Sequence, residues 1–83
     1  MKILRLSLRN IWYDEIKNNK KRIEYRCHNR YYERLNKYSN GDKVIFRRGR
    51  YGKEQMEFII KKIVLTNNDN PLKEKPIWEI HFV

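Results

Sequence analysis

Apolar and polar residues alternate in five short segments of the chain, and this pattern constrains the fold more than any other feature of the sequence. A period of two places successive side chains on opposite faces, as in a β-strand that has one face on a core and one in solvent. The sequence therefore predicts five short strands. They run over residues 2–8, 22–27, 43–48, 55–65 and 77–83.

Four of these strands have a clear apolar face. The side chains that we expect to point to the core are Leu4, Leu6, Leu8, Val44, Phe46, Met56, Phe58, Ile60, Trp78, Ile80 and Phe82. In the first strand, Arg5 and Ser7 lie on the opposite face. A hairpin turn is predicted at residues 49–52, between the third and fourth strands, and a polar surface loop is predicted at residues 66–76.

The strand at residues 22–27 carries a charge at every second position. Its predicted inward side holds Ile23, Tyr25 and Cys27. Its predicted outward side holds Arg22, Glu24 and Arg26. We expect the charged side to form an exposed strand face, with Lys21 at the start of the strand.

Two short helices are predicted between the strands. Asn10 is the predicted N-cap of the first helix, and Asn18-Asn19 offers a left-handed exit at its end. Asn29 is the predicted cap of the second helix, which continues to about Tyr38. The side chains that pair at helical spacing in this second helix are Tyr31 and Leu35.

The length and the element pattern together indicate a single domain over residues 1–83. Five strands with two small helices predict an α+β fold. We expect the strands to form a small β-barrel, because closure removes the sheet edges that otherwise pair with other chains.

The charge of the chain points to an acidic partner. Lys and Arg number 20 against 10 Asp and Glu, which gives a net charge of +10. A protein that neutralises several phosphates releases counterions and gains affinity, so a nucleic acid is the favoured partner. A merely solubilising surface and an anionic membrane surface are the alternatives.

Other functional classes receive little support from the sequence. No apolar run approaches the ~20 residues that a membrane span needs, and the first ten residues are too polar for a secretory signal. A cytoplasmic location is therefore expected. Cys27 is the only cysteine, and His28 and His81 lie far apart without acidic or thiol neighbours at ligand spacing, so no metal is expected. No glycine-rich phosphate loop is present, and no cofactor is expected.

Two basic clusters remain as candidate nucleic-acid contacts. The first holds Lys17, Lys20, Lys21, Arg22 and Arg26, and the second holds Lys43, Arg47, Arg48, Arg50 and Lys53 together with Tyr51. A ring among arginines suits single-stranded RNA, because the ring stacks on a base while guanidinium groups hold phosphates. A solvated charged hairpin is the alternative. The predicted nucleic-acid contacts are Lys20, Arg22, Arg47, Arg48, Arg50, Tyr51 and Lys53.

Glu24 and Ser7 are the informative exceptions within this basic surface. Glu24 lies between Arg22 and Arg26 on one strand face. It either forms a structural ion pair with Arg26 or accepts hydrogen bonds from the exocyclic amine of a base. Ser7 either donates to a ligand or is an ordinary surface serine.

The order of these segments resembles that of the ASCH domains in the PUA-like superfamily. The resemblance rests on Leu6-Ser7-Leu8, on residues 19–26 (NKKRIEYR) and on residues 41–46 (GDKVIF). The family hallmark reads G-x-K-x-x-E-x-R. Its Lys, Glu and Arg correspond to Lys21, Glu24 and Arg26, while Asn19 replaces the glycine and, like glycine, adopts left-handed backbone.

The resemblance implies a PUA-like β-barrel with a cleft beside the first helix, and a role in RNA binding or metabolism. The residues expected to bind a nucleotide or modified base in that cleft are Ser7, Lys21, Glu24 and Arg26. The main hypothesis is thus an RNA-binding domain whose cationic cleft recognises a nucleotide.

Two further functions stay open. Some ASCH relatives hydrolyse N4-acetylcytidine with the motif lysine, a threonine three residues later and a distant glutamate, and others are ribonucleases. Lys21 corresponds to that lysine, whereas Glu24 occupies the threonine position; both would be catalytic only in an enzyme. Otherwise Lys21 stays charged and holds a phosphate or carboxylate. The last alternative is a docking protein for an acidic protein partner.

Overall fold

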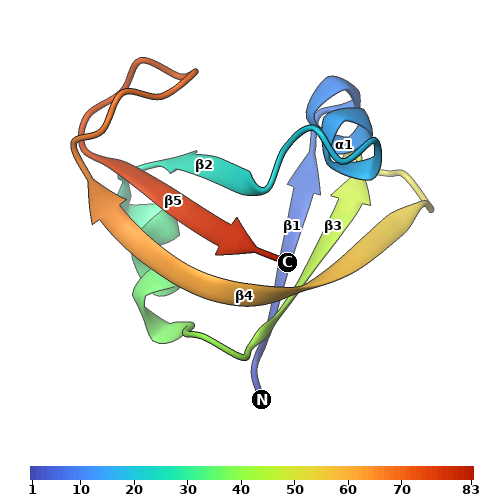
Figure 1. Cartoon of the computed structure of the whole chain (residues 1–83), viewed down its shortest axis with the longest axis horizontal. Coiled ribbons are helices and arrows are strands. Elements are labelled where there is room, and N and C mark those ends of the chain that lie inside the picture. The colour runs from blue at the N-terminus through green and yellow to red at the C-terminus, as the bar shows by residue number, and fades with distance from the viewer.

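The computed structural model describes residues 1–83 and contains five strands and two helices (Figure 1). The elements are β1 (Ile3–Leu8), α1 (Asn10–Lys17), β2 (Ile23–Cys27), the 3₁₀ helix η1 (Arg30–Lys37), β3 (Lys43–Arg48), β4 (Gln55–Thr66) and β5 (Ile77–Phe82). The α+β class and the five strands agree with the sequence prediction, and strand bounds differ from it by one residue or so. No helix is both long and apolar enough to cross a membrane.

The strands form one mixed sheet in the order β1-β3-β4-β5-β2. β1 pairs with β3 in parallel, and the other three pairs are antiparallel. β1 and β2 are the two edge strands, and no backbone pairing joins them. The sheet is therefore open, and the predicted closure of the strands into a small β-barrel is not confirmed.

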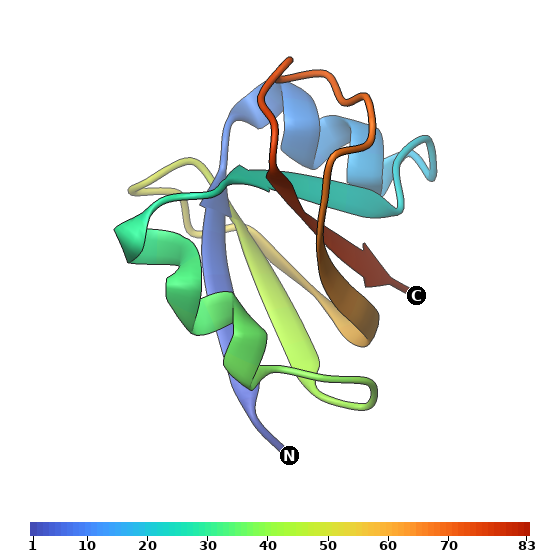
Figure 2. The ribbon, with the colours of Figure 1, turned by 90° about the vertical axis from the view of Figure 1, so that its left-hand side faces the viewer.

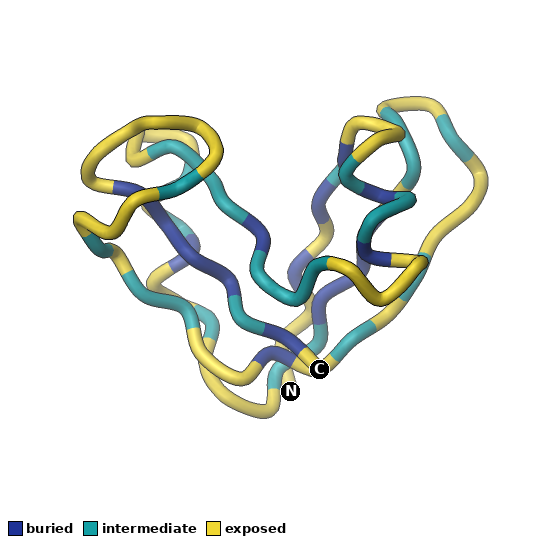
Figure 3. The backbone as a smooth tube through the Cα atoms, turned by 45° about the horizontal axis from the view of Figure 1, so that its top comes forward, coloured by how far each residue is buried: buried dark blue, intermediate teal, exposed yellow.

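β4 is the longest strand, and it belongs to both halves of the sheet. Residues 55–59 pair with β3, and residues 60–66 pair with β5. The register shifts between Ile60 and Lys62, where the strand bends. Figure 3 shows the result as a V-shaped backbone with both termini near its base. β1 and β3 form one arm of the V, and β2 and β5 form the other (Figures 1 and 3).

The hydrophobic core lies between the two arms. Its buried side chains are Leu4, Leu6, Leu8, Tyr13, Ile16, Leu35, Val44, Phe46, Ile60, Trp78, Ile80 and Phe82. Phe82 packs against Phe46 and Phe58 with ring centroids 5.0 and 4.9 Å apart, respectively. The predicted inward faces of β1, β3, β4 and β5 are thereby confirmed.

α1 begins differently from the prediction. Arg9 occupies the N-cap position with extended backbone, and no side chain caps the helix. Asn10 is instead the first helical residue. The predicted exit is confirmed, because Asn19 has a φ of 64°, in the left-handed region. Tyr13 and Ile16 anchor the helix in the core, while Figure 2 shows α1 following the upper end of β1.

η1 is capped as predicted but has a tighter winding. The side chain of Asn29 accepts a hydrogen bond from the Tyr32 backbone N–H at 3.1 Å. In a 3₁₀ helix, residues three apart share a face. Tyr32 and Leu35 therefore pack on the core, while Tyr31 is 66% exposed. The predicted Tyr31–Leu35 pairing assumed α-helical spacing and is wrong.

The two connecting segments are as predicted. Arg47 pairs with Gln55, and the Arg48 N–H donates to the Glu54 carbonyl at 3.0 Å, so residues 49–52 lie in a hairpin loop. Residues 67–76 form a surface loop organised by Asn70, whose side chain donates to the Glu74 carbonyl at 2.7 Å and accepts from the Leu72 N–H at 3.0 Å.

Candidate ligand-binding site

The charged side of β2 faces the interior of the V, opposite to the prediction. Glu24 is only 4% exposed. The antiparallel register sets Glu24 beside Ile80 and Arg26 beside Trp78, which are core residues of β5. Directly paired residues point to the same side of a sheet, so the charged positions share the core side. Ile23, Tyr25 and Cys27 are only partly buried on the other face.

Glu24 is balanced by two cations, which makes its burial tolerable. The Lys21 Nζ lies 3.0 Å from Glu24 Oε1. The Arg26 guanidinium donates through Nε at 2.9 Å and lies 2.8 Å from Glu24 Oε2 through its Nη2. A buried carboxylate needs such partners, because moving a carboxylate out of water without a partner costs several kcal/mol. Of the two interpretations of Glu24, the ion pair with Arg26 is present. We call Lys21, Glu24 and Arg26 the triad.

Arg26 also connects the two arms of the V. Its Nη2 donates to the Ser7 carbonyl at 2.9 Å, and its Nη1 donates to the Tyr32 hydroxyl at 2.9 Å. Ser7 lies on β1, whereas Arg26 lies on β2. A single guanidinium therefore spans the gap between the two edge strands.

Lys21 is held by aromatic rings as well as by Glu24. Its Nζ lies 4.4 Å from the centroid of the Trp12 ring and 5.7 Å from that of Tyr25. Both contacts are in the range of cation–π attraction. The ammonium group thus has an anion and two rings around it.

A cleft of about 310 Å³ lies between α1, β1 and β2, and Glu24 and Arg26 of the triad line it. Lys21, predicted as a ligand-binding residue, lines neither this cleft nor the larger pocket described next. Trp12 and Tyr25 supply aromatic walls, and Leu72 of the 67–76 loop supplies an apolar one. We call this the triad cleft. Its lining residues are Ser7, Leu8, Arg9, Trp12, Glu24, Tyr25, Arg26, Cys27, Tyr32 and Leu72.

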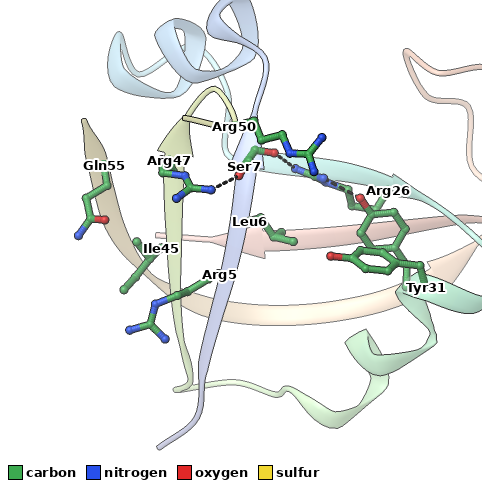
Figure 4. Close-up of a pocket in the computed structure, with 10 residues that line it drawn as sticks. Arg5, Leu6, Ser7, Arg26, Tyr31, Ile45, Arg47, Arg50 and Gln55 are labelled. Carbon is green, nitrogen blue, oxygen red and sulfur yellow. Dashed lines mark hydrogen bonds between the residues drawn. The ribbon is translucent and has the colours of Figure 1, made fainter. Parts of the chain in front are cut away.

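A larger pocket, of about 640 Å³, lies on the outer face of β1 and β3 between η1 and the β3–β4 hairpin (Figure 4). It contains four arginines and no carboxylate. We call it the arginine pocket. Its lining residues are Arg5, Leu6, Ser7, Arg26, Tyr31, Tyr32, Ile45, Arg47, Arg50 and Gln55.

The strand register explains how this pocket is assembled. Ser7 pairs with Arg47, and Arg47 pairs with Gln55, so these three side chains form a row across β1, β3 and β4. Arg5 pairs with Ile45 in the next row on the same face. Because side chains on one face repeat every second residue, both rows project into the same space.

Three of the four pocket arginines have no acidic partner. The side chains of Arg5 and Arg50 form neither a hydrogen bond nor an ion pair, and the side chain of Arg47 only donates to the Ser7 hydroxyl at 3.2 Å. Arg26 differs, because it forms an ion pair with Glu24, which it shares with Lys21. Unpaired guanidinium groups around one concavity produce a local positive potential that attracts anions.

The remaining predicted nucleic-acid contacts lie elsewhere. The Arg48 guanidinium binds Asp14 through two contacts of 3.2 Å, and this hydrogen bonding lowers the pKa of the Asp14 carboxyl. Arg22 donates to the Ile16 carbonyl at 3.0 Å and lies 5.2 Å from the Phe58 ring, so it serves the fold. Tyr51 is 86% exposed and lines neither site. Lys20 and Lys53 are exposed and line neither site as well.

The structure thus brings together part of the predicted set and adds other residues. The predicted residues that line the arginine pocket are Ser7, Arg26, Arg47 and Arg50. The polar residues that sequence reasoning did not include are Arg5, Tyr31, Tyr32 and Gln55. Alternation in β1 already placed Arg5 beside Ser7, and this was the available signal. No group of three or more His, Cys, Asp or Glu side chains is arranged to hold a metal ion.

The comparisons with known proteins give no family assignment. Neither the scan against protein-family models nor the search of curated proteins found a match.

Proposed function

We propose that this protein is a PUA-like, ASCH-type module that binds single-stranded RNA, with phosphates in the arginine pocket and a base in the triad cleft. One observation carries the proposal: a pocket of about 640 Å³ that contains four arginines and no carboxylate. A ligand that fits such a pocket is anionic, and phosphate is the anion whose geometry the guanidinium fork matches.

The aromatic residues favour RNA over a simple anion. Tyr31 stands at the rim of the arginine pocket with two thirds of its surface exposed, and the Arg34 guanidinium lies 5.0 Å from its ring. An exposed ring beside arginines is a platform for an unstacked base, and bases are unstacked in single strands.

The two sites adjoin each other at the residues that line both of them, which are Ser7, Arg26 and Tyr32. A nucleotide whose phosphate lies in the arginine pocket can therefore extend its base toward the triad cleft, past Arg26. The cleft offers Trp12 and Tyr25 for stacking. Its volume of about 310 Å³ lies at the lower end of the range for small-molecule sites.

The geometry favours binding over hydrolysis of N4-acetylcytidine or RNA. A lysine that acts as a base needs a free amine, whereas Lys21 Nζ is ion-paired with Glu24 at 3.0 Å. Both oxygens of Glu24 are occupied by the two cations. Turnover would require the triad to separate.

The test measures the affinity of a short, labelled single-stranded RNA by fluorescence anisotropy between about 50 and about 200 mM salt. Each phosphate contact contributes about 0.7 to the slope of log affinity against log salt for single strands. Arg47→Gln with Arg50→Gln should reduce this slope by about 1.4 and weaken binding by about tenfold or more.

The matched control is Lys61→Gln with Lys62→Gln, which removes two charges from exposed positions of β4 that line neither site. It should change the affinity little. A parent protein whose affinity is insensitive to salt contradicts the proposal, and so does a double variant that binds RNA as well as the parent; the latter result supports an acidic protein partner. Release of cytidine from N4-acetylcytidine by the parent, lost in Lys21→Ala, would show an enzyme.

A further inference from the structure

Building on the proposed function, we infer that the arginine pocket is a subsite for a terminal phosphate group, a phosphomonoester, and that internal phosphodiesters fit it less well. The ligand is then the phosphorylated end of an RNA strand or a free nucleotide. The inference depends on the number, direction and surroundings of the unpaired guanidinium groups.

The charge of the pocket exceeds that of a phosphodiester. Arg5, Arg47 and Arg50 have no carboxylate partner, whereas Arg26 forms an ion pair with Glu24 at 2.8 Å. An internal phosphodiester carries one negative charge, and a phosphomonoester carries about 1.5 to 2 near pH 7. The monoester neutralises more of the three free cations.

The hydrogen-bonding capacity points the same way. The three free guanidinium groups come from three different segments, namely β1, β3 and the β3–β4 hairpin, and Figure 4 shows them on different sides of Ser7. A phosphomonoester presents three acceptor oxygens that do not continue the chain. A phosphodiester has only two, and so offers fewer acceptor sites to the three guanidinium groups. The Ser7 hydroxyl, which accepts from Arg47 at 3.2 Å, is a further potential donor.

The pocket also has one aromatic side and one cationic side. Tyr31 and Tyr32 stand on the η1 side, with ring centroids 4.8 Å apart in an edge-to-face arrangement. Arg47, Arg50 and Gln55 stand on the side of the β3–β4 hairpin (Figure 4). This polarity suits one nucleotide whose phosphate lies among the arginines and whose base extends along the tyrosine side toward the triad cleft.

The experiment compares three RNA competitors of one sequence: one with a 5′-phosphate, one with a 3′-phosphate and one with hydroxyl groups at both ends. Each competes with the same labelled RNA in the anisotropy assay. One phosphorylated form should bind about tenfold more tightly than the hydroxyl form, because it adds charge-assisted hydrogen bonds to the guanidinium groups. Cytidine 5′-monophosphate and cytidine form a fourth and fifth arm, which test whether a free nucleotide suffices.

The decisive variant is Arg5→Gln, which removes one free guanidinium group from an exposed position. It should abolish the preference for the phosphorylated end while weaker, salt-dependent RNA binding persists. Lys62→Gln should keep the preference intact, and thermal melting should show that both variants fold.

Equal affinity of all three RNA forms, with Arg5→Gln weakening them equally, would overturn the terminal-phosphate inference and leave the proposed RNA binding intact. The absence of salt-dependent binding by every form would overturn both. A monophosphate that competes better than cytidine supports the subsite with a free nucleotide as its source.

Discussion

Arg26 and the other three arginines of the arginine pocket lie close together but have different roles. Arg26 is largely buried, and its guanidinium contacts Glu24, Tyr32 and Ser7. Arg5 and Arg50 are exposed and have no hydrogen-bond or ion-pair partner. The net charge of +10 is therefore not spread evenly over the surface. Some basic side chains, such as Arg26, pair with groups that hold the fold together. Others, such as Arg5, have no acidic partner and line the arginine pocket.

The largest expected effect comes from removing the anion that Arg26 and Lys21 share. Glu24→Gln keeps the shape of the side chain but leaves two poorly exposed cations facing one neutral group. The free energy of unfolding should fall by about 3 kcal/mol, because breaking a buried ion pair strands its partner. Urea denaturation measures this change.

The control for Glu24→Gln is Glu57→Gln, which breaks a partly exposed ion pair with Lys43 at 3.2 Å. Such surface pairs contribute about 0 to 1 kcal/mol. If Glu24→Gln and Glu57→Gln lower the free energy of unfolding equally, the triad does not stabilise the fold in the way that we describe.

A second, smaller effect separates the two kinds of arginine directly. Arg26→Gln should lower the free energy of unfolding by about 2 kcal/mol, since it leaves the Ser7 carbonyl and Tyr32 hydroxyl without their donor. Arg50→Gln should leave stability within about 0.5 kcal/mol and weaken RNA binding severalfold. Denaturation and anisotropy on both variants test the contrast. A large loss of stability in Arg50→Gln would contradict the distinction between Arg26, which stabilises the fold, and Arg50, which is available for a ligand.

The smallest effect concerns acid sensitivity at Arg48, the neighbour of Arg47 that lines neither site. The hydrogen bond from Arg48 lowers the pKa of Asp14 in the folded protein. The stabilisation is therefore present above the ordinary pKa of an aspartate and is lost as the pH falls through the lowered pKa of the folded state. Arg48→Gln should show a smaller decrease in melting temperature than the parent between about pH 5 and about pH 2. Equal acid sensitivity would mean that this contact does not persist in solution.

Local patterns were sufficient for the strands but not for the face of β2. Alternation is visible within a few residues, which is why all five strands were predicted. At β2, however, both faces carry bulky side chains, and hydrophobicity favoured Ile23 and Tyr25 as the inward residues. The register with β5 and the paired cations around Glu24 reversed this choice. Both depend on contacts far apart in the sequence.

The arginine pocket was only partly predictable for the same reason. Arg47 and Arg50 were included because they lie in one basic run. Arg5 joins them only through the parallel pairing of β1 with β3, which connects segments 40 residues apart. Alternation alone would have separated Arg47 from Arg48, because adjacent strand residues point to opposite faces. Gln55 and Tyr31 carry no charge, so a search for basic residues does not find them.

Arg26 joins the two edge strands of the open sheet through a hydrogen bond from its side chain. In a closed barrel, a ladder of backbone hydrogen bonds would join the first and last strands, and its loss would require many bonds to break together. Here a single guanidinium group connects β1 to β2 at the Ser7 carbonyl. The same group lines both candidate sites. A ligand at either candidate site would therefore contact the side chain that joins the two edge strands.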